Sequence, residues 1–535
     1  MKKTFVMLMA LAIIAGEAFA GGIMTNTNQS ASFIRNPSRG ASLDVDAVYF
    51  NPAGLVFLKD GFHFSLNNQT ISQERKINTD FQGLNRSEFI GSVSAPLFPS
   101  VYAAYKKDNF AFALGLNPIG GGGSAFYEEG LPSFEMQVAM VPMGLSSAGI
   151  STTQYQYDVE FDGRSIFWGF QGVAAYKVSD MFSVSAGVRY LTAKNEYNGY
   201  LKDIMINPNQ PAFGANYNGT NMVLATTFFT DASNTFTAWF NGATAYVSGL
   251  QPIITGGGGG VLLVNGEVVG LTATQIAQIQ GLIMAAGQNP AEVDIATAQA
   301  ILNAAAPVFA ASSTIMAQNA AATADKEVAA TQTGSSIVPI IGFSLRPADN
   351  LVIGFKYEHK GSMTLKNKTE KDDTGLFPDG DETPSDMPSM FALGVTYGAT
   401  PKLRLSGTVH YYLDKNANYG KKLAGASVSN SEVIDSNLWE AAFGVEYLIS
   451  RNFLVSAGYL RTQTGVKDVY QSDLSHSLST NSIGAGLRYG IMDKIGLNLG
   501  VMNTWYTENV RAFSTFNETY NRKAFVLAVG VDVSF

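Results

Sequence analysis

Several residue types and patterns that mark common protein classes are absent from this sequence of 535 residues. It contains no cysteine, which excludes disulfide scaffolds, thiolate metal sites and cysteine nucleophiles. Charged residues make up only 15%, against roughly 25% in a typical soluble protein. The formal net charge is −8 and no basic block occurs, which argues against a nucleic-acid partner.

Signs of catalysis are also missing. Only four histidines occur, none in a metal-binding spacing, and the run Gly256–Gly260 lacks the Lys-Ser/Thr of a phosphate-binding loop. His410 shares its predicted strand face with Ser406 and Thr408, but residues of one face are commonplace and no acid converges on them in the sequence. We therefore expect no enzyme, no metal and no cofactor.

Long apolar runs are scarce as well. Lys2 and Lys3 precede an apolar stretch and then Ala18-Phe19-Ala20, a pattern typical of a cleaved signal peptide over residues 1–20. No later segment offers about 18 uninterrupted apolar residues. The exported chain therefore stays soluble or crosses a membrane as strands.

The sequence does contain long stretches in which apolar residues alternate with small or polar ones. Along the last residues of the chain one face is apolar and ends in a C-terminal aromatic, at Phe525, Leu527, Val529, Val531, Val533 and Phe535. A period of two over this length places one face in an apolar environment and the other in water. The same alternation recurs between six short polar turns, at residues 106–109, 178–180, 346–350, 399–402, 450–452 and 491–494.

Between these turns lie seven longer connections, near 75–92, 118–150, 201–335, 368–385, 416–431, 465–477 and 509–522. Six turns and seven loops join fourteen strands, an even number with both ends on one side. The sequence thus predicts an all-β transmembrane fold, a 14-stranded antiparallel barrel in the outer membrane of a Gram-negative bacterium. The alternative is a soluble β-sandwich, whose strands are usually shorter.

Residues 21–60 precede the first convincing strand, near Gly61 to Gln73, within a barrel expected over 61–535. Their apolar residues favour burial over a solvated tail. A fourteen-stranded barrel has a lumen wide enough for a plug. We therefore expect residues 21–60 to form an N-terminal hatch inside the barrel, with a gate at Asn51, Pro52, Ala53 and Gly54.

The hatch carrying Asn51-Pro52-Ala53, the strand count and the C-terminal Phe535 together resemble the FadL family of outer-membrane transporters. That resemblance implies passive uptake of hydrophobic small molecules, most often long-chain fatty acids, and aromatic hydrocarbons in TodX-like members. It also implies outer-membrane lipid and the barrel-assembly machinery as partners. The extracellular insertion 201–335 is long and Ala-rich for the family, which leaves the substrate class open.

A transporter of this kind needs an extracellular site that captures the substrate, a binding pocket in the lumen and an exit into the membrane. Helices within 272–330 are predicted by a capping box at Thr272 and Gln275 and by a cap at Asn289-Pro290. The apolar faces of these helices either form an exposed apolar groove or pack on each other in a core.

The exit is assigned to the third strand, which meets Asn117-Pro118 and a glycine run. Proline removes a ladder donor and glycine weakens strand pairing. In FadL-like proteins a kink in this strand makes a lateral opening, which the resemblance places at Asn117, Pro118, Gly120, Gly121, Gly122 and Gly123. The alternative is an ordinary Gly-rich start to a loop.

The lumen pocket is assigned from strand parity, which turns eight charged residues inward: Arg189, Lys356, Glu358, Arg404, Glu440, Glu446, Arg488 and Asp532. A fatty acid carboxylate needs one buried cation, and we nominate Lys356 and Arg404, with Phe50 and Phe57 along the tail. The alternative is a lumen of mutually neutralising ion pairs. At the level of the whole protein, the alternative is a general diffusion porin or an adhesin-like structural barrel.

Overall fold

The computed structural model describes residues 23–423, 425–491 and 494–535. The expected signal peptide, residues 1–20, lies outside the described residues. The chain divides into two compact units. One contains residues 136–158 and 201–325, and the other contains the remaining described residues, including most strands and the N-terminal segment.

The larger unit is a closed antiparallel barrel of fourteen strands, which confirms the predicted fold class. β1 pairs with β2 on one side and with β20 on the other, so the first and last strands close the cylinder. The wall consists, in order, of β1 (Gly61–Thr79), β2 (Glu88–Lys107), β3 (Phe110–Tyr127), β4 (Tyr155–Ser179), β5 (Phe182–Ile206), β7 (Lys326–Ala348), β8 (Leu351–Glu358) with β9 (Thr364–Asp372), β11 (Met390–Gly398) with β10 (Glu382–Pro384), β12 (Leu403–Tyr412), β15 (Trp439–Ser450), β16 (Phe453–Gln463), β17 (Thr480–Ile491), β18 (Ile495–Tyr506) and β20 (Asn517–Ser534).

Along the strands of this wall, outward-facing apolar residues alternate with residues that face the interior. On β20, Phe525, Leu527 and Val529 are exposed on the outer surface, whereas Val526 and Ala528 between them are buried. Short turns join the strands at the end of the barrel where β1 begins and β20 ends, here called the short-turn end. Long connections lie at the other end, the long-loop end, and carry short elements: β13 (Lys422–Leu423), β14 (Ala426–Ser427), β19 (Asn509–Ala512), α7 (Asn430–Val433), η5 (Asp414–Asn416) and η6 (Asp468–Tyr470).

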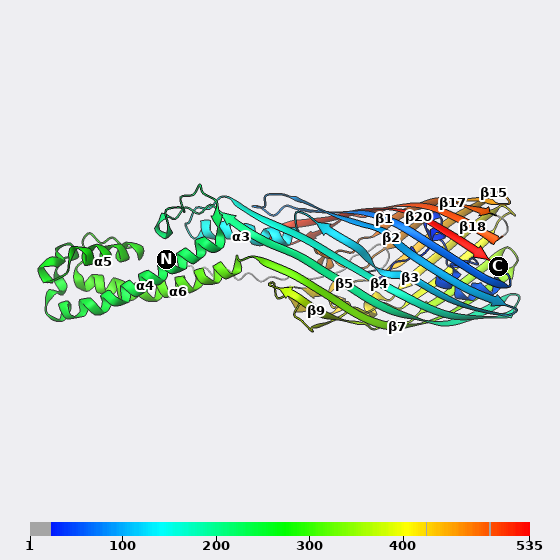
Figure 1. Ribbon diagram of the computed structural model, residues 1–535, viewed down its shortest axis with the longest axis horizontal. Helices are drawn as coiled ribbons and strands as arrows, with labels where there is room; N and C mark the ends of the chain where they lie inside the picture. Colours follow the sequence, from blue (N-terminus) through cyan, green and yellow to red (C-terminus); the bar gives the residue numbers. More distant parts are fainter. Residues whose placement is uncertain (1–22, 424, 492–493) are drawn as a thin grey trace. The chain divides into compact units, whose positions relative to one another are not determined.

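The N-terminal segment lies inside the ring of strands (Figure 1). It contains α1 (Ala31–Arg35), α2 (Ala47–Phe50) and η1 (Pro52–Phe57), and nearly all of its residues from Ile23 to Val56 are buried. Ser30 begins α1 because its Oγ accepts a hydrogen bond from Phe33 N at 3.0 Å. The apolar residues that argued against a solvated tail thus form part of the barrel's main core cluster.

The smaller unit is largely helical, with α4 (Ala225–Thr255), α5 (Ala273–Ala285) and α6 (Ile295–Ala322) as its main helices, as well as part of α3 (Pro132–Ser147), the short β6 (Val223–Leu224), and η2 (Pro211–Phe213), η3 (Gly258–Gly260) and η4 (Leu263–Val269). The predicted capping box at Thr272 and Gln275 is present. The apolar faces of α5 and α6 are buried in one shared cluster, so these helices pack on each other rather than leaving a groove between them.

Two helical features differ from the sequence expectation. α6 begins after Asp294, whose side chain caps Thr297 N at 2.7 Å, whereas Asn289 forms a local turn to Ala291 N. The cap at Asp294 prevails because burial of the apolar stripe begins at Ile295. The helix α4, 31 residues long, was not predicted, because its many Thr residues are weak helix formers and mask its apolar spacing. α6 is long and apolar enough to cross a membrane by length and composition, but one such helix is weak evidence of a span.

Candidate functional site

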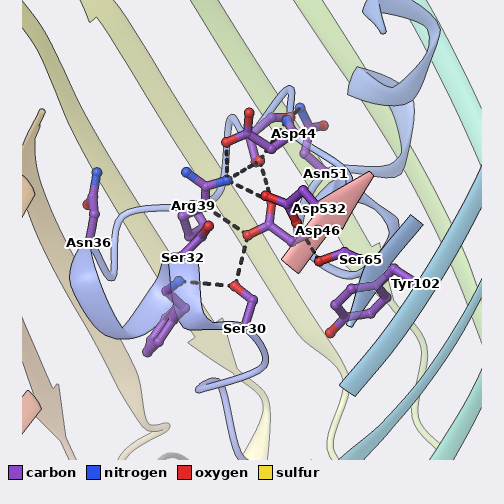
Figure 2. A network of polar contacts seen from close by, with 12 residues as sticks. Ser30, Ser32, Asn36, Arg39, Asp44, Asp46, Asn51, Ser65, Tyr102 and Asp532 are labelled. Carbon is purple, nitrogen blue, oxygen red and sulfur yellow. Dashed lines mark hydrogen bonds and ion pairs between the residues drawn. The ribbon is translucent and has the colours of Figure 1, made fainter. Parts of the chain in front are cut away.

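A network of charges, buried except at Asp44, holds the N-terminal segment together. The Arg39 guanidinium contacts both carboxylate oxygens of Asp46, at 2.7 and 3.0 Å, and Asp44 at 2.7 Å. Asp46 also accepts hydrogen bonds from Ser30 Oγ at 2.9 Å and Ser42 Oγ at 2.7 Å, as Figure 2 shows for Ser30. Because the bidentate pair fixes both planar groups, this network ties the start of α1 to the start of α2.

The charge of this network also acts on Asp44. Burial opposes ionisation of the Asp44 carboxyl, but the positive charges of Arg39, Arg488 and Arg404 outweigh it and hold its pKa well below the usual range. The carboxylate therefore stays ionised at any physiological pH.

Ion pairs also attach the segment to the barrel wall. Arg35 in α1 contacts Glu446 of β15 at 2.6 Å. The ring of Tyr49 lies against two wall cations, with Lys356 Nζ 4.5 Å and Arg189 Cζ 4.9 Å from its centroid. Both cations pair with Glu358, at 2.7 and 2.6 Å. The charges of this part of the inner wall thus neutralise one another, and its two cations also contact Tyr49 of the segment.

Wall glycines allow the backbone of the segment to approach closely. A Cβ at Gly484 would meet the carbonyl oxygen of Ile34, and a Cβ at Gly394 would meet the backbone of Gly40. Any larger residue at these two positions would force the segment away from the wall.

The barrel wall is interrupted between β2 and β3. Their pairing stops after Ser94 and resumes at Val101 on β2, opposite Ser124 and Leu116 on β3. Over the same stretch the pairing of β3 with β4 shifts register between Pro118 and Gly120 and again beyond Gly121. The predicted break thus lies within a continuing strand, not in a loop that begins at residue 118.

The N-terminal segment covers this gap from inside. Thr25 forms a bridge with Gly120, Asn26 N donates to Ile119 O at 2.8 Å, and Asn26 Nδ2 donates to Gly121 O at 2.8 Å. The segment thereby supplies backbone partners that β2 does not supply here.

Gln29 completes the seal. Its Nε2 donates to Pro118 O at 3.0 Å, and its Oε1 accepts from Asn117 Nδ2 at 2.8 Å. Its backbone oxygen accepts from Ser100 Oγ at 2.7 Å and from Tyr102 Oη at 2.8 Å. One fully buried glutamine thus joins the unpaired stretches of β2 and β3.

A cavity of about 70 Å³ adjoins the seal; we call it the lumen cavity. Its wall is mostly apolar with hydroxyl groups between, and it reaches Gly121 at the gap and Glu440 on the opposite side. Its lining residues are Asn26, Thr27, Asn28, Phe33, Ile71, Gln73, Val93, Ala95, Phe98, Gly121, Glu440, Leu460, Thr462, Thr480, Ser482, Met502, Thr504, Ala524 and Val526.

Two arginines lie one inward-facing position beyond this cavity, toward the long-loop end. Gln73 and Ala524 line the cavity, and Arg75 and Arg522 follow them on the same faces of β1 and β20, directly opposite each other. Both arginines are buried. Gln73 accepts from Arg75 Nε at 3.2 Å, which connects the arginine to the cavity wall.

The charge of Arg522 is not balanced locally. Among the described residues no carboxylate lies within ion-pair distance of Arg522, and its Nε has no hydrogen-bond partner. Its guanidinium carbon lies 5.2 Å from the centroid of the Tyr506 ring, and its Nη2 donates to His476 O at 3.4 Å. A buried donor of this kind is suited to an incoming anion.

The residues predicted for the hatch and the opening lie where the segment meets the wall. Asn51 is fully buried and its Nδ2 donates to Ser42 O at 3.1 Å, while Pro52, Ala53 and Gly54 begin η1. Ala53 O accepts from Ser183 Oγ at 2.7 Å. They lie close to the short-turn end, whereas the residues Asn117, Pro118, Gly120, Gly121, Gly122 and Gly123 lie at the gap.

The residues predicted to bind substrate are not gathered around the lumen cavity. Lys356 is fully buried, and its Nζ donates to Tyr49 O at 2.7 Å besides its pair with Glu358. The Arg404 side chain is half exposed and lies 3.1 Å from Glu446. Phe50 stacks on Phe33 at 5.6 Å within the segment, and Phe57 lies under Arg346. Their role in binding stays a prediction.

Sequence reasoning did not select Gln29, Arg75 or Arg522. The observation that identifies the two arginines is the pairing register of β1 with β20, which places these two like charges opposite each other. It also found no acid near His410, whereas the structure places Glu440 Oε2 3.2 Å from His410 Nδ1. Among the described residues no cluster of three or more His, Asp or Glu side chains is arranged to hold a metal ion.

No family model and no curated protein matches the sequence. Among solved structures, the chain is similar to a FadL homologue of Pseudomonas aeruginosa, with a TM-score of 0.57 and 14% identity, over 96% of this chain and 100% of that one. It is also similar to a deltaS2 mutant of the TodX monoaromatic hydrocarbon channel, with a TM-score of 0.50 and 14% identity, over 95% and 98%. The chain thus has the fold of FadL-type barrels.

Proposed function

We propose that the protein is an outer-membrane channel of a Gram-negative bacterium for passive uptake of hydrophobic small molecules, with long-chain fatty acids as its substrates. An apolar outer surface on a closed barrel suits a lipid environment. A barrel of the same fold is a monoaromatic hydrocarbon channel, which supports a hydrophobic substrate and a transport role rather than catalysis. Transport down a gradient needs no cofactor.

The observation that carries the proposal is the mostly apolar lumen cavity with a cationic end. An alkyl chain would lie along the apolar wall, and its carboxylate would reach Arg75 and Arg522. We favour Arg522 over Lys356 and Arg404, because those two cations already contact Glu358 and Glu446, whereas no described carboxylate lies within ion-pair distance of Arg522. A headgroup bound there would have to displace an existing partner.

The closed cavity is too small for a whole fatty acid. Its volume is about 70 Å³, whereas ligand pockets usually measure roughly 300–1,000 Å³. Asn26, Thr27 and Asn28 form one side of it, so withdrawal of the N-terminal segment would enlarge the cavity. The same movement would uncover the gap between β2 and β3, because the segment bonds to both. Binding and lateral exit into the membrane would then be coupled.

The headgroup assignment is tested by oleate uptake in cells that depend on this protein. Arg522→Gln removes the charge but keeps a polar group, and loss of a charge-assisted hydrogen bond costs about 1.5–3 kcal/mol. We expect uptake at limiting oleate to fall by about tenfold or more. Lys523→Gln is the matched control, because Lys523 is the neighbouring residue and lies exposed on the outer face.

Toluene uptake separates recognition from folding. Arg522→Gln should leave it unchanged, because toluene carries no charge. An equal loss for both compounds would make Arg522 a structural residue, and undiminished oleate uptake would refute a carboxylate at this position.

The exit is tested by Pro118→Val, which returns a backbone donor to β3 and leaves Gly120 unchanged, because a Cβ at Gly120 would meet Met24 O of the segment. The strand former should favour pairing across the gap and slow oleate uptake, while the barrel stays heat-modifiable on gels. Unchanged uptake would remove the lateral exit from the mechanism.

The plug is tested by deleting residues 21–60 from the mature chain. Loss of the buried segment should open a conductive pore in planar bilayers. An unchanged conductance would favour the alternative, a general diffusion porin whose N-terminal segment does not block the pore.

A further inference from the structure

Another buried cation, Lys421, lies in a loop at the long-loop end of the barrel. Lys421 is 6% exposed and lines a cavity of about 80 Å³ that shares no lining residue with the lumen cavity. We call it the loop cavity. Its other lining residues are Met24, Asn195, Tyr197, Gln332, Leu365, Asn367, Leu376, Phe377, Asp381, Thr383, Pro384, Ser385, Tyr419, Gly420, Lys422 and Tyr470.

The amine of Lys421 is buried without a polar partner among the residues that the structure describes. Among the described residues, its Nζ has no hydrogen-bond acceptor and no carboxylate within ion-pair distance. The nearest specific contact is the face of the Tyr470 ring, 4.1 Å away. An ammonium group carries three donors, and burying it without acceptors is unfavourable. The site is therefore incomplete as a purely structural feature and is suited to an acceptor from outside the chain.

The titratable groups around Lys421 are Asp381 on the loop before β10, Lys422 on β13, Tyr470 on η6, Asp473 and His476 on the following loop, and Arg511 on β19. Tyr419 lies on its own loop. Burial lowers the pKa of Lys421 to about 7, and Arg511 lowers it further while Asp473 opposes the shift. Burial also lowers the pKa of His476, so this imidazole stays neutral.

We propose that the loop cavity binds a small monocarboxylate, with Lys421 as the residue that holds its charge. Lys421 supplies one buried positive charge, which matches one negative charge, and Asp381 on the same cavity wall disfavours a dianion such as phosphate. Apolar and aromatic side chains line much of the remaining wall, which suits an apolar body next to the carboxylate. The volume limits that body, since a cavity of about 150 Å³ is known to hold benzene.

The carboxylate has two conceivable sources, a free short-chain acid or the head of a long-chain acid whose tail leaves the cavity. The site is independent of the proposed transport function, because neither Arg75 nor Arg522 contributes to it. We commit to the free short acid, since the closed cavity has room for a few carbons only.

The test measures binding of ¹³C-labelled propionate by NMR to the full-length protein in a non-ionic detergent at pH 6. Lys421→Met should weaken binding at least tenfold, and Lys402→Met should leave it unchanged, because Lys402 is exposed and does not line the loop cavity. Arg522→Gln should also leave it unchanged, which separates this site from the proposed headgroup site. Heat-modifiability on gels checks that each variant is folded.

The pH dependence provides the second readout. Because the free amine loses its proton near pH 7, propionate should bind about tenfold more weakly at pH 8 than at pH 6. Lys421→Arg, which stays charged, should bind with equal strength at both values. This pair of results would not follow from a role of Lys421 in packing alone.

Four results would overturn the proposal: equal propionate binding by wild type and Lys421→Met, competition by uncharged propionamide, competition by chloride at equal concentration, or affinity independent of pH in the wild type. Laurate distinguishes the sources. Tighter binding of laurate than of propionate, lost in Lys421→Met, would assign the site to long-chain heads and refute the short acid.

Discussion

The seal formed by Gln29 gives the most quantitative prediction. Its side chain makes three hydrogen bonds, to Asn26 O at 2.7 Å, to Pro118 O at 3.0 Å and from Asn117 Nδ2 at 2.8 Å. Gln29→Leu removes all three and keeps a side chain of similar size. At about 1 kcal/mol net for each bond, the closed seal should lose about 3 kcal/mol. The fraction of molecules with an open seal should then rise about 100-fold.

Hydrogen exchange measures this directly. The amide of Asn26 is protected by its bond to Ile119 O, so its exchange rate reports opening of the seal. We expect that rate to rise about 100-fold in Gln29→Leu, while amides in the middle of β20 keep their wild-type rates. Ser32→Ala is the control, because the bond of Ser32 Oγ to Asn498 Oδ1 is long, at 3.4 Å, and a change below about tenfold is expected.

Two results would refute the reasoning. An unchanged rate at Asn26 would mean that the side chain of Gln29 does not hold the seal. An equal rise throughout residues 23–58 would mean that the whole segment loosens as one body, so the seal would have no local stability of its own.

Three further predictions concern other parts of the chain. Gly484→Leu should displace α1, because its side chain would meet the carbonyl oxygen of Ile34, and overpacking of about 1–3 kcal/mol should appear as faster exchange at the Ile34 amide; unchanged exchange would contradict the close approach. Leu302→Ala should destabilise the helical unit by about 2–5 kcal/mol without shifting the thermal unfolding of the barrel, read by calorimetry; a matching shift of the barrel would show that the units do not unfold separately. Because the pKa of Asp44 is lowered in the folded state, its contribution to stability is complete above its ordinary pKa of 3.8 and is lost as pH falls below it. Asp44→Asn should therefore flatten the rise in hydrogen exchange of the N-terminal segment between pH 4 and pH 2, and a rise as steep as in the wild type would show that another acid controls it.

The barrel could be predicted from the sequence because lipid outside and water inside impose a period of two on every strand. The outward face of β20 follows this pattern residue by residue, from Phe525 to Val531. The long helix α4 was not predicted, because its apolar face includes alanines and threonines that give little periodic signal. Helical packing of this unit depends on contacts with α6 that the local sequence does not reveal.

The candidate site was harder to predict because parity gives the face of a residue but not its partner. Lys356 faces inward as expected, yet Glu358 on the same face takes up its charge. Arg404 stands directly opposite Glu446 in the β12–β15 register. Arg75 and Arg522 become a pair only when the first and last strands meet, 447 positions apart in the chain. Such a separation leaves no trace in a local pattern.

The closing seam between β1 and β20 also sets an order of events during biogenesis. Among the wall strands β20 comes last in the chain, so the cylinder stays open until β20 has been made. The N-terminal segment runs directly into β1, at the edge of that opening. Once the two edges have joined, the wall surrounds the buried charges of the segment and its bonds to β2 and β3, so the segment can enter or leave only through an end of the cylinder. Closure of the seam thus confines the N-terminal segment laterally.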